Sequence, residues 1–548
     1  MPSRSFSVVA RGLTVARGGR PILARVDLSL EPGARVGVVG PNGVGKTTLL
    51  RVLAGVDVPD EGTVTRRPVT TRVGYLAQEA DRSTETLGAF LERRAGVTAA
   101  ESALAAASVR LAAGSAGADE AYAAALDGYL ASGGPDLDAR MRAVCADLGL
   151  PARLVDAPTS TLSGGEAARA SLASVLLSRF DVLLLDEPTN DLDFVGLERL
   201  EQFVQDGEGA VAVVSHDRAF LERTITSVVE LDEHAHTATE YAGGWAAYLE
   251  ARATARRHAE EEYAAYRAER SRLEERSRTQ RQWAVQGVRR AKRDDGERDK
   301  YIRHARIVRS EQQAAKARAT DRVLERLEIV EKPWEGWALR LEIASAGRSR
   351  EHVVRLDGAV VERGGFRLGP VDLDVRWGDR MVIVGPNGSG KTTLLLAVLG
   401  RVPLVAGSRH VGPSVVVGEI DQTRTAFSGP AHLLDAFIAE TGLILPEARS
   451  LLAKFGLEAD HVLRPTATLS PGERTRAVLA RFQAQGVNCL VLDEPTNHLD
   501  LPAIEQLEQA LESYEGTLLL VTHDRRLLDT VRVTRTVHVV GGSVRERT

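Results

Sequence analysis

The sequence has very few cysteines and no long apolar stretch. Its 548 residues include 2 cysteines, Cys145 and Cys489, which are too few for a disulfide framework and lack metal-ligand spacing. No run approaches the roughly 18 apolar residues that a membrane helix requires, and the amino terminus lacks the apolar core of a secretory signal. We therefore expect a cytoplasmic protein in which both cysteines are buried packing residues.

Aromatic residues are also scarce, at 5%, but apolar residues at 43% and charged residues at 26% are typical of a globular protein. The length suggests roughly three to five structural units. The net charge of −5 argues against a protein that coats nucleic acid uniformly. The charge is unevenly distributed, because residues 246–332 hold 23 Lys or Arg and 16 Asp or Glu. A basic segment therefore joins two acidic parts.

The chain contains an internal repeat. GPNGVGKTT at 40–48 returns as GPNGSGKTT at 385–393, and LLLDEPTNDLD at 183–193 returns as LVLDEPTNHLD at 490–500. The early motifs are 345 residues apart and the late motifs 307, so the first copy holds an insertion of about 38 residues. Two Ala-rich segments around the Gly-containing turn at 114–117 predict that this insertion, at about 98–131, is a pair of antiparallel helices.

Each copy is predicted to have a parallel α/β core. β-branched runs lead directly into the glycine loops, and later apolar runs such as DVLLLDE and NCLVLDE indicate buried parallel strands. Between the copies, residues 248–282 and 301–331 are charged and poor in Gly and Pro, which predicts two long helices joined by a turn at 285–300. The expected domains are 1–245, a helical linker at 246–332, and 333–548.

The glycine loops predict two phosphate-binding sites. Glycines let backbone N–H groups approach phosphates, Lys46 and Lys391 are expected to reach the terminal phosphates, and Thr47 and Thr392 can offer a hydroxyl to Mg²⁺. The loop residues predicted to bind ATP are Gly40, Asn42, Gly43, Gly45, Lys46, Thr47, Thr48, Gly385, Asn387, Gly388, Gly390, Lys391, Thr392 and Thr393.

Two pairs of acidic residues follow apolar strands. Asp186 and Asp493 are placed to hold Mg²⁺, and the next residues, Glu187 and Glu494, are placed to polarise an attacking water. Acidic residues at strand ends are common, but the same order in both copies favours a catalytic role. The sequence therefore predicts ATP hydrolysis.

The later motifs resemble the signature of the ABC superfamily: LSGGE at 162–166 and LSPGE at 469–473. Gln78 and Gln422 match the family's Q-loop glutamine, a metal and catalytic residue, and His216 and His523 match its switch histidine. The resemblance implies that each signature contacts the ATP held by the opposite glycine loop, within one monomeric chain. Ser163, Gly164 and Gly165 would then face Lys391, and Ser470 and Gly472 would face Lys46.

The sequence departs from this superfamily at two places. Arg17 and Arg363 stand where an aromatic side chain often stacks on adenine, so either their guanidinium groups replace the ring or they are solvated arginines. Pro471 replaces a signature glycine, which fixes φ and removes an N–H donor. We therefore expect the two sites to hydrolyse ATP at different rates.

The whole chain resembles the ABC-F family, through its two cassettes, inserted arm, charged linker and the DEPTNDLD and DEPTNHLD sequences. The resemblance implies that the ATP-closed protein binds the ribosome at the tRNA exit site, with the linker reaching toward the P-site tRNA and the peptidyl transferase centre. Some members regulate or rescue translation, and others protect ribosomes from antibiotics. The implied partners are therefore ribosomal RNA and P-site tRNA.

The expected linker tip, residues 281–309, has ten Lys or Arg and four Asp or Glu, with Trp283 and Tyr301 interleaved among the charges. Phosphate attraction together with stacking on unpaired bases is how RNA is commonly held. The composition of the tip therefore favours contact with RNA. The candidate RNA contacts are Arg289, Arg290, Lys292 and Arg293.

Three alternatives remain open from the sequence. The linker could be a solvated helical hairpin without an RNA partner. The chain could be an ATPase subunit that energises separate membrane subunits, although the twin-cassette ATPases of that class lack a long basic linker. It could also be a DNA-associated ABC ATPase, which DNA would stimulate.

Overall fold

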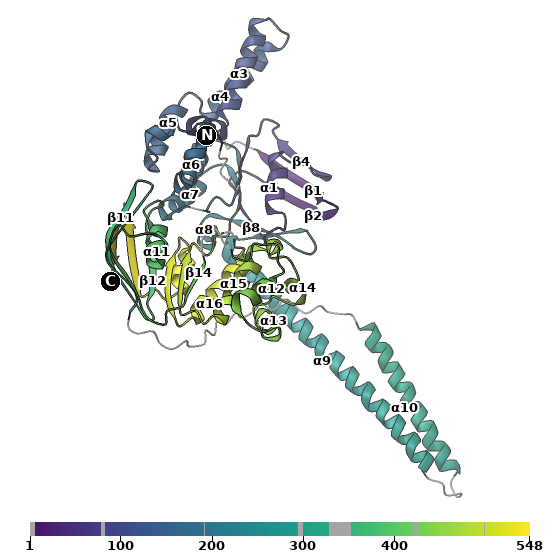
Figure 1. The fold of residues 1–548 in the computed structure, drawn as a ribbon. Coiled ribbons are helices and arrows are strands. Elements are labelled where there is room, and N and C mark those ends of the chain that lie inside the picture. The colour runs from purple at the N-terminus through teal and green to yellow at the C-terminus, as the bar shows by residue number, and fades with distance from the viewer. Residues whose placement is uncertain are drawn as a thin grey trace. The chain divides into compact units, whose positions relative to one another are not determined.

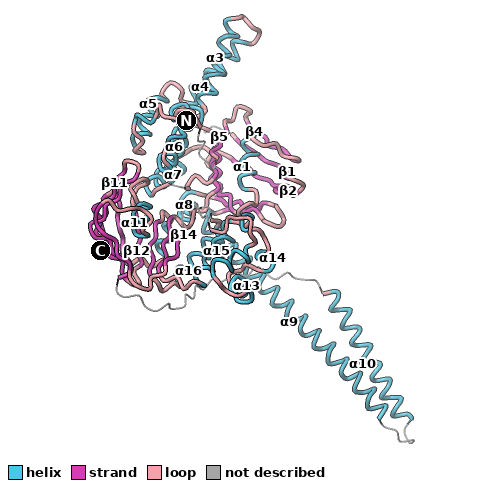
Figure 2. The backbone as a smooth tube through the Cα atoms, viewed as in Figure 1, coloured by secondary structure: helices cyan, strands magenta, loops and turns pink. Residues whose placement is uncertain are grey.

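A computed structural model describes residues 6–77, 83–190, 192–293, 300–327, 352–420, 426–497 and 499–547. The chain divides into two units (Figures 1 and 2). One unit combines Met1–Ala247 with Trp337–Thr548 and holds both cassettes, and the other is Tyr248–Gly336. The domain boundaries expected near 245 and 332 remain predictions.

The first cassette is built on a six-stranded sheet in the order β5-β6-β7-β3-β8-β9. All neighbouring strands are parallel except β8 and β9, which are antiparallel. Strands β6 and β7 are buried along their whole length, as expected for apolar strands covered on both faces. The strands are β3 (Arg35–Val39), β5 (Val73–Leu76), β6 (Val182–Asp186), β7 (Ala210–Val214), β8 (Ser227–Leu231) and β9 (Ala238–Ala242).

The second cassette repeats this topology in the order β14-β15-β16-β12-β17-β18, with β17 and β18 antiparallel. The predicted class, two α/β nucleotide-binding domains with a helical insertion in the first and a two-helix linker, is confirmed. The strands are β12 (Arg380–Val384), β14 (Val417–Ile420), β15 (Cys489–Asp493), β16 (Thr517–Val521), β17 (Arg535–Val540) and β18 (Ser543–Arg547).

A second, antiparallel sheet of three strands accompanies each core, and the sequence patterns did not reveal it. In the first cassette its inward residues, such as Val8, Leu13 and Leu28, join the same apolar cluster as Leu49 and Leu50 of the helix after the glycine loop. This layer therefore holds that helix in place. The strands are β1 (Ser7–Arg17), β2 (Arg20–Leu30), β4 (Glu61–Arg67), β10 (His352–Arg363), β11 (Phe366–Arg376) and β13 (Ala406–Val411).

Four helices in each cassette begin at or within two residues of a motif residue. In the first cassette they are α1 (Lys46–Ala54), α6 (Gly164–Leu177), α7 (Phe194–Asp206) and α8 (Arg218–Thr224). In the second they are α11 (Lys391–Leu399), α15 (Pro471–Ala484), α16 (Leu501–Ser513) and α17 (Arg525–Thr530). The same unit also contains α2 (Leu87–Arg94), α5 (Leu137–Asp147), α12 (Leu433–Thr441), α13 (Leu445–Lys454) and α14 (Ala459–Val462).

The inserted segment forms α3 (Val97–Ala112) and α4 (Ala118–Ser132), which pack against each other (Figure 1). Gly114 and Gly117 take positive φ in the turn between them, which glycine allows at little cost. Most residues of both helices are at least partly exposed. The predicted pair of helices in the insertion is therefore present.

The linker forms α9 (Gly244–Arg293) and α10 (Lys300–Arg326). The turn predicted at 285–300 is wrong in its first part, because α9 continues to Arg293. A glycine inside a helix lowers the helix's stability by only about 1 kcal/mol relative to alanine. The single Gly287 is therefore not enough to end α9. Thr320 donates to the Gln280 side chain at 3.1 Å and Arg281 to Asp321 at 2.6 Å, which ties the two helices together.

Among the helices that the structure describes, none is long and apolar enough to cross a membrane. Both cysteines are buried, as expected.

Candidate nucleotide sites

The motif residues of each cassette meet at one edge of its sheet. In the first cassette the glycine loop follows β3, Asp186 ends β6, and His216 lies two residues after β7. Because β6, β7 and β3 are parallel neighbours, their carboxyl ends meet at the edge where α/β sheets bind ligands. The second cassette has the same arrangement. We call the site that contains Lys46 site 1 and the site that contains Lys391 site 2.

The glycine loops curl around the two lysines. Lys46 Nζ donates to the Gly40 carbonyl at 2.7 Å, and Lys391 Nζ to the Gly385 carbonyl at 2.7 Å. Burial lowers the pKa of both lysines, and nearby carboxylates oppose that shift. Gly45 has a φ of 113°, and a Cβ there would lie 2.7 Å from Ile22, so only glycine fits this turn.

The residues predicted to hold Mg²⁺ lie together. Thr392 Oγ1 donates to Asp493 Oδ2 at 2.8 Å in site 2. In site 1, Asp186 Oδ2 accepts from the Tyr75 hydroxyl at 3.2 Å, whereas the buried Oδ1 has no hydrogen-bond partner among the described residues. Burial raises the pKa of Asp186. A buried carboxylate oxygen without a partner suits a hard cation, so these residues fit Mg²⁺. Gln78 and Gln422 lie outside the described residues.

The two glutamates after the strands have unusual backbone conformations. Glu187 has a φ of 50° and Glu494 a φ of 47°, a left-handed region that non-glycine residues seldom adopt. Such strain persists where the surrounding structure imposes it, and it concentrates at functional sites. Burial raises the pKa of Glu187 to about 7.

Each glutamate lies beside the switch histidine of its own cassette. His216 Nε2 is 3.1 Å from Glu187 Oε1, and His523 Nε2 is 3.5 Å from Glu494 Oε1. Burial lowers the pKa of both histidines to about 3, with the adjacent lysine adding to the effect, so both rings are neutral near pH 7. Lys391 Nζ lies 3.0 Å from His523 Nε2, which favours the tautomer with the proton on Nδ1.

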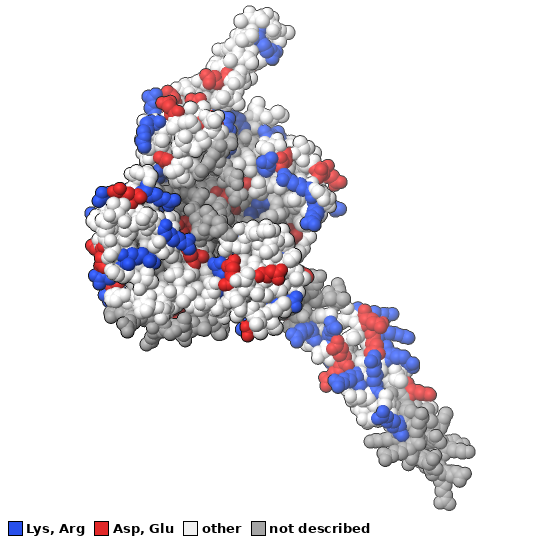
Figure 3. Space-filling view, viewed as in Figure 1, with Lys and Arg blue, Asp and Glu red and all other residues white. Residues whose placement is uncertain are grey.

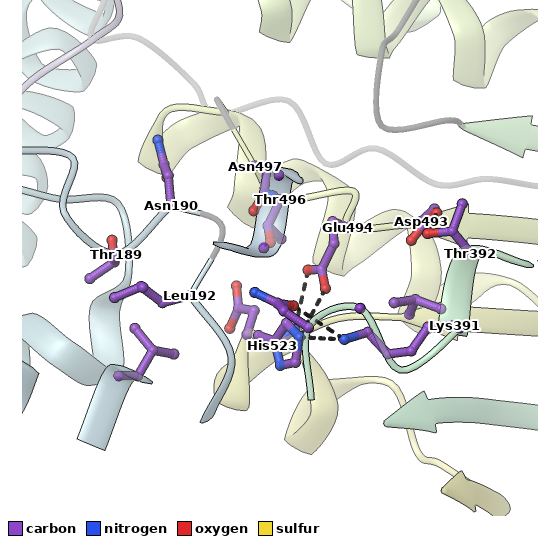
Figure 4. A pocket seen from close by; sticks show the side chains of 18 of the residues that line it. Thr189, Asn190, Leu192, Lys391, Thr392, Asp493, Glu494, Thr496, Asn497 and His523 are labelled. Atoms are coloured by element: carbon purple, nitrogen blue, oxygen red, sulfur yellow. Dashed lines mark hydrogen bonds and ion pairs between the residues drawn. The ribbon is translucent and has the colours of Figure 1, made fainter. Parts of the chain in front are cut away.

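Residues of both cassettes line a cavity of about 590 Å³ at site 2 (Figure 4). The second cassette lines it with Lys391, Thr392, Asp493, Glu494 and His523. The first cassette lines it with residues of its signature helix, of the DEPTN segment and the helix that follows it, and of the segment around His216. They are Gly164, Gly165, Thr189, Asn190, Leu192, Leu197, His216 and Asp217. The arrangement can enclose a phosphate chain between a glycine loop and the start of the opposite signature helix.

Comparison with known proteins supports this interpretation. The family described as ABC transporter matches residues 23–190 and 368–497. The tylosin resistance ATP-binding protein TlrC of Streptomyces fradiae is 36% identical over 549 residues, which cover 96% of this chain and 96% of that protein. ABC transporter F family member 5 of Arabidopsis thaliana is 30% identical, with 96% and 74% covered. The chain belongs to the ABC-F family.

Two further similarities agree with this assignment. The energy-dependent translational throttle protein EttA of Mycobacterium tuberculosis is 31% identical over 545 residues, covering 96% of this chain and 90% of that protein. Among solved structures, the complex of archaeal ribosomal stalk protein aP1 with the archaeal ribosome recycling factor aABCE1 matches with a TM-score of 0.57. Its 18% identity, over 98% of this chain and 89% of that one, shows a shared fold. This ABC-F chain is an ATP-binding ATP hydrolase.

The signature helices of the ABC-F chain begin with the same cap. Ser163 and Ser470 each accept from the backbone N–H three residues later, and Glu166 and Glu473 accept in return from the cap residue's N–H. Gly164 is the first residue of α6 and Pro471 that of α15. Proline is common at the first position of a helix, so Pro471 in place of a glycine leaves α15 intact. It removes one N–H donor at the start of that helix. Ser163, Ser470 and Gly472 as ATP contacts remain predictions.

Two site residues were missed by sequence reasoning. Asp193 Oδ2 of the first cassette accepts from the Asn387 N–H at 3.0 Å, and Asp500 Oδ2 of the second accepts from the Asn42 N–H at 3.2 Å. Both aspartates cap the helix that follows the DEPTN segment. Each ends its copy of the repeated motif, and this shared position could have identified them from the sequence.

Stacking of Arg17 and Arg363 on adenine remains a prediction, and the two side chains lie in different surroundings. Arg17 donates to Asp57 at 2.9 Å and is more than half exposed, whereas Arg363 lines the cavity at site 2. Phe366, which is not among the residues predicted from the sequence, also lines that cavity. Ile22 lies against Gly45 at site 1, where Phe366 lies against Gly390 at site 2. An aromatic ring is therefore available at site 2.

Proposed function

We propose that this ABC-F ATPase binds the ribosome near the tRNA exit site when ATP closes its cassettes, and modulates translation or protects the ribosome from an antibiotic. Hydrolysis then permits release. TlrC is named for tylosin resistance and EttA for translational throttling, and both align with nearly the whole chain. The proposed site of action is the cytoplasm, and the chain acts as a monomer.

The linker unit carries the ribosomal part of the proposal. Lys and Arg side chains follow α9 and α10 in Figure 3, with acidic residues between them. Trp283 is 58% exposed and Arg289 is exposed, so both are available for stacking or phosphate contact. We propose contacts of this unit with ribosomal RNA and the P-site tRNA, with Arg290, Lys292 and Arg293 as further contacts.

The site residues then have the following roles. Lys46 and Lys391 hold the terminal phosphates through charge and hydrogen bonds. Glu187 and Glu494 accept a proton from the attacking water, and the neutral histidines beside them fix its position. Thr47, Asp186, Thr392 and Asp493 would hold Mg²⁺, which neutralises phosphate charge when it is bound.

Replacing both Glu187 and Glu494 by Gln tests the proposal. The exchange removes the proton acceptors but leaves the lysines and aspartates, so ATP stays bound and the closed state persists. We expect the double variant to sediment with ribosomes in sucrose gradients that contain ATP and to inhibit translation. Adding Lys46→Ala and Lys391→Ala should release it.

The matched control is Glu208→Gln with Glu515→Gln, which makes the same change at equivalent exposed positions of the two cassettes. This control should remain hydrolytically active and dissociate from ribosomes. A Glu187→Gln, Glu494→Gln protein that binds ATP yet stays in the ribosome-free fractions would refute the ribosomal role. Sedimentation with membranes, or stimulation by DNA, would favour one of the other two classes.

A further inference from the structure

The interface between the cassettes contains two reciprocal ion pairs. Arg218 of α8 donates to Glu508 of α16 in the other cassette, and Arg525 of α17 donates to Glu201 of α7 at 2.8 Å. The arginines occupy equivalent positions of the repeat, as do the glutamates. The contact therefore follows the internal symmetry of the chain.

These pairs are largely removed from solvent. The side chain of Arg218 is 4% exposed and that of Glu508 is 10% exposed, compared with 20% and 9% for Arg525 and Glu201. A buried charge is tolerated when its partner is present and is strongly destabilising when the partner is removed. Each pair therefore has a marked preference for the arrangement in which the cassettes touch.

Each arginine lies close in sequence to a switch histidine. Arg218 follows His216 by two residues and begins α8, and Arg525 follows His523 by two residues and begins α17. A shift of the arginine therefore moves the short segment that carries the histidine beside the catalytic glutamate. No other part of the proposed mechanism uses these arginines.

Each glutamate lies on a helix that also contacts the opposite glycine loop. Helix α7 begins after Asp193, which accepts from Asn387, and carries Glu201 about two turns later, about 12 Å along the axis. One rigid helix of the first cassette therefore touches both the glycine loop and the switch segment of site 2. Helix α16 does the same for site 1, through Asp500 and Glu508.

Site 2 has a third contact of this kind. Phe194, the first residue of α7, lies edge-on to His523 with 5.0 Å between ring centroids, and the Arg525 guanidinium lies 6.0 Å from the Phe194 ring. The residue at the equivalent position of α16 is Leu501. The neighbouring cassette therefore touches the switch histidine of site 2 directly.

We propose that Arg218 and Arg525 are positioning residues, which set the switch histidine of each site through a glutamate on the opposite cassette. Hydrolysis at a site is thereby coupled to contact with the other cassette. The proposal concerns hydrolysis by the isolated chain, so it does not depend on binding to a ribosome.

The test uses Arg218→Glu, Glu508→Arg and the combined exchange. Each single change places like charges together, so we expect kcat to fall about 10-fold or more, while the dissociation constant for ATP changes less than about 3-fold. The combined Arg218→Glu, Glu508→Arg chain restores the pair and should recover most of kcat. A purely structural role would not separate kcat from ATP affinity.

The control is Arg532→Glu with Glu512→Arg, a pair within the second cassette whose side chains are 77% and 53% exposed. These changes should leave kcat unchanged. If the Arg218 variants fail to fold, Arg525→Gln provides the same test at a more exposed position, with Arg223→Gln as its control because Arg223 binds Glu201 from the same cassette. Normal kcat in folded Arg218→Glu or in Arg525→Gln would overturn the proposal.

Discussion

Asp217 follows the switch histidine His216 and is a largely enclosed carboxyl group. Its side chain accepts from the Phe220 N–H at 3.0 Å as the cap of α8. Burial raises the pKa of Asp217 to about 6, and Asp524 and Glu201 add to the rise, while the hydrogen bond from Phe220 and the charge of Arg525 oppose it. The ionised form is therefore disfavoured in the folded chain.

The first prediction follows from this shift. The folded chain binds the Asp217 proton more tightly than the unfolded chain, so the free energy of unfolding falls as pH rises from about 4 to 6. Asp217→Asn keeps the cap without the charge. We expect this variant to be more stable than the parent by about 1–3 kcal/mol at pH 7.5, and nearly equal to it at pH 4.

Urea unfolding of the ATP-free chain at both pH values measures the difference. Asp529→Asn removes the same charge at an exposed position and should show no such pH-dependent gain. A pH-independent stability difference between Asp217→Asn and the parent would contradict the burial argument.

At the scale of elements, the linker helices are held together by contacts between residues 277–281 of α9 and 320–321 of α10. Ala317 and Thr320 of α10 are buried in the described linker, and Ser277 of α9 is bonded to Asp321. Arg289 lies farther along α9 and is exposed, so its charge can be changed with little effect on the hairpin.

The second prediction concerns the charges at this end of α9. Reversing them at Arg289, Arg290, Lys292 and Arg293 should weaken ribosome binding about 10-fold or more and reduce its salt dependence, because phosphate contacts release counterions. ATP hydrolysis without ribosomes should stay close to the parent value. The measurement is ribosome affinity at several salt concentrations.

The matched control reverses four exposed arginines of the same helix nearer its start, Arg257, Arg267, Arg272 and Arg276. It introduces the same change in charge. If the ribosome contacts lie at the tip, this control should lose less ribosome affinity than the tip variant. Equal affinity for the tip variant and the parent would identify the linker as a solvated hairpin.

At the scale of the whole molecule, the two nucleotide sites are predicted to be composite, with each built from both cassettes. Site 2 brings Lys391 and Gly165 to one cavity, and a Cβ on Gly165 would lie 3.0 Å from Asn387. The polar contacts of Asp193 and Asp500 with the opposite glycine loops are consistent with this arrangement at both sites.

The third prediction separates composite sites from self-contained ones. In the Glu187→Gln, Glu494→Gln background, Lys391→Ala with Ser163→Arg damages site 2 twice and leaves site 1 intact. Lys391→Ala with Ser470→Arg damages one component of each site. We expect the first chain to retain about one nucleotide after a chase with unlabelled ATP, and the second to retain almost none.

The two chains serve as controls for each other, since both carry one lysine and one serine exchange. If the Ser470→Arg chain retains nucleotide and the Ser163→Arg chain does not, each signature contacts the nucleotide of its own cassette.

The sequence alone determined the duplicated α/β cores and the identity of the motif residues. Glycine loops, acidic strand ends and buried apolar strands are local signals, because short runs of neighbouring residues produce them. The positions of Lys46, Asp186, Glu187 and His216 at one sheet edge follow from such runs. The helical nature of the linker also follows from composition, although α9 continues to Arg293, beyond the predicted start of the turn at 285.

Only the tertiary structure decided which residues meet across the cassettes. Arg218 and Glu508 are 290 residues apart, and no local pattern relates them. The same applies to Asp193 with Asn387, and to Phe366 at the site 2 cavity. The physical reason is that these contacts depend on how two separately folded surfaces pack, which is fixed by the shape and charge of both surfaces together.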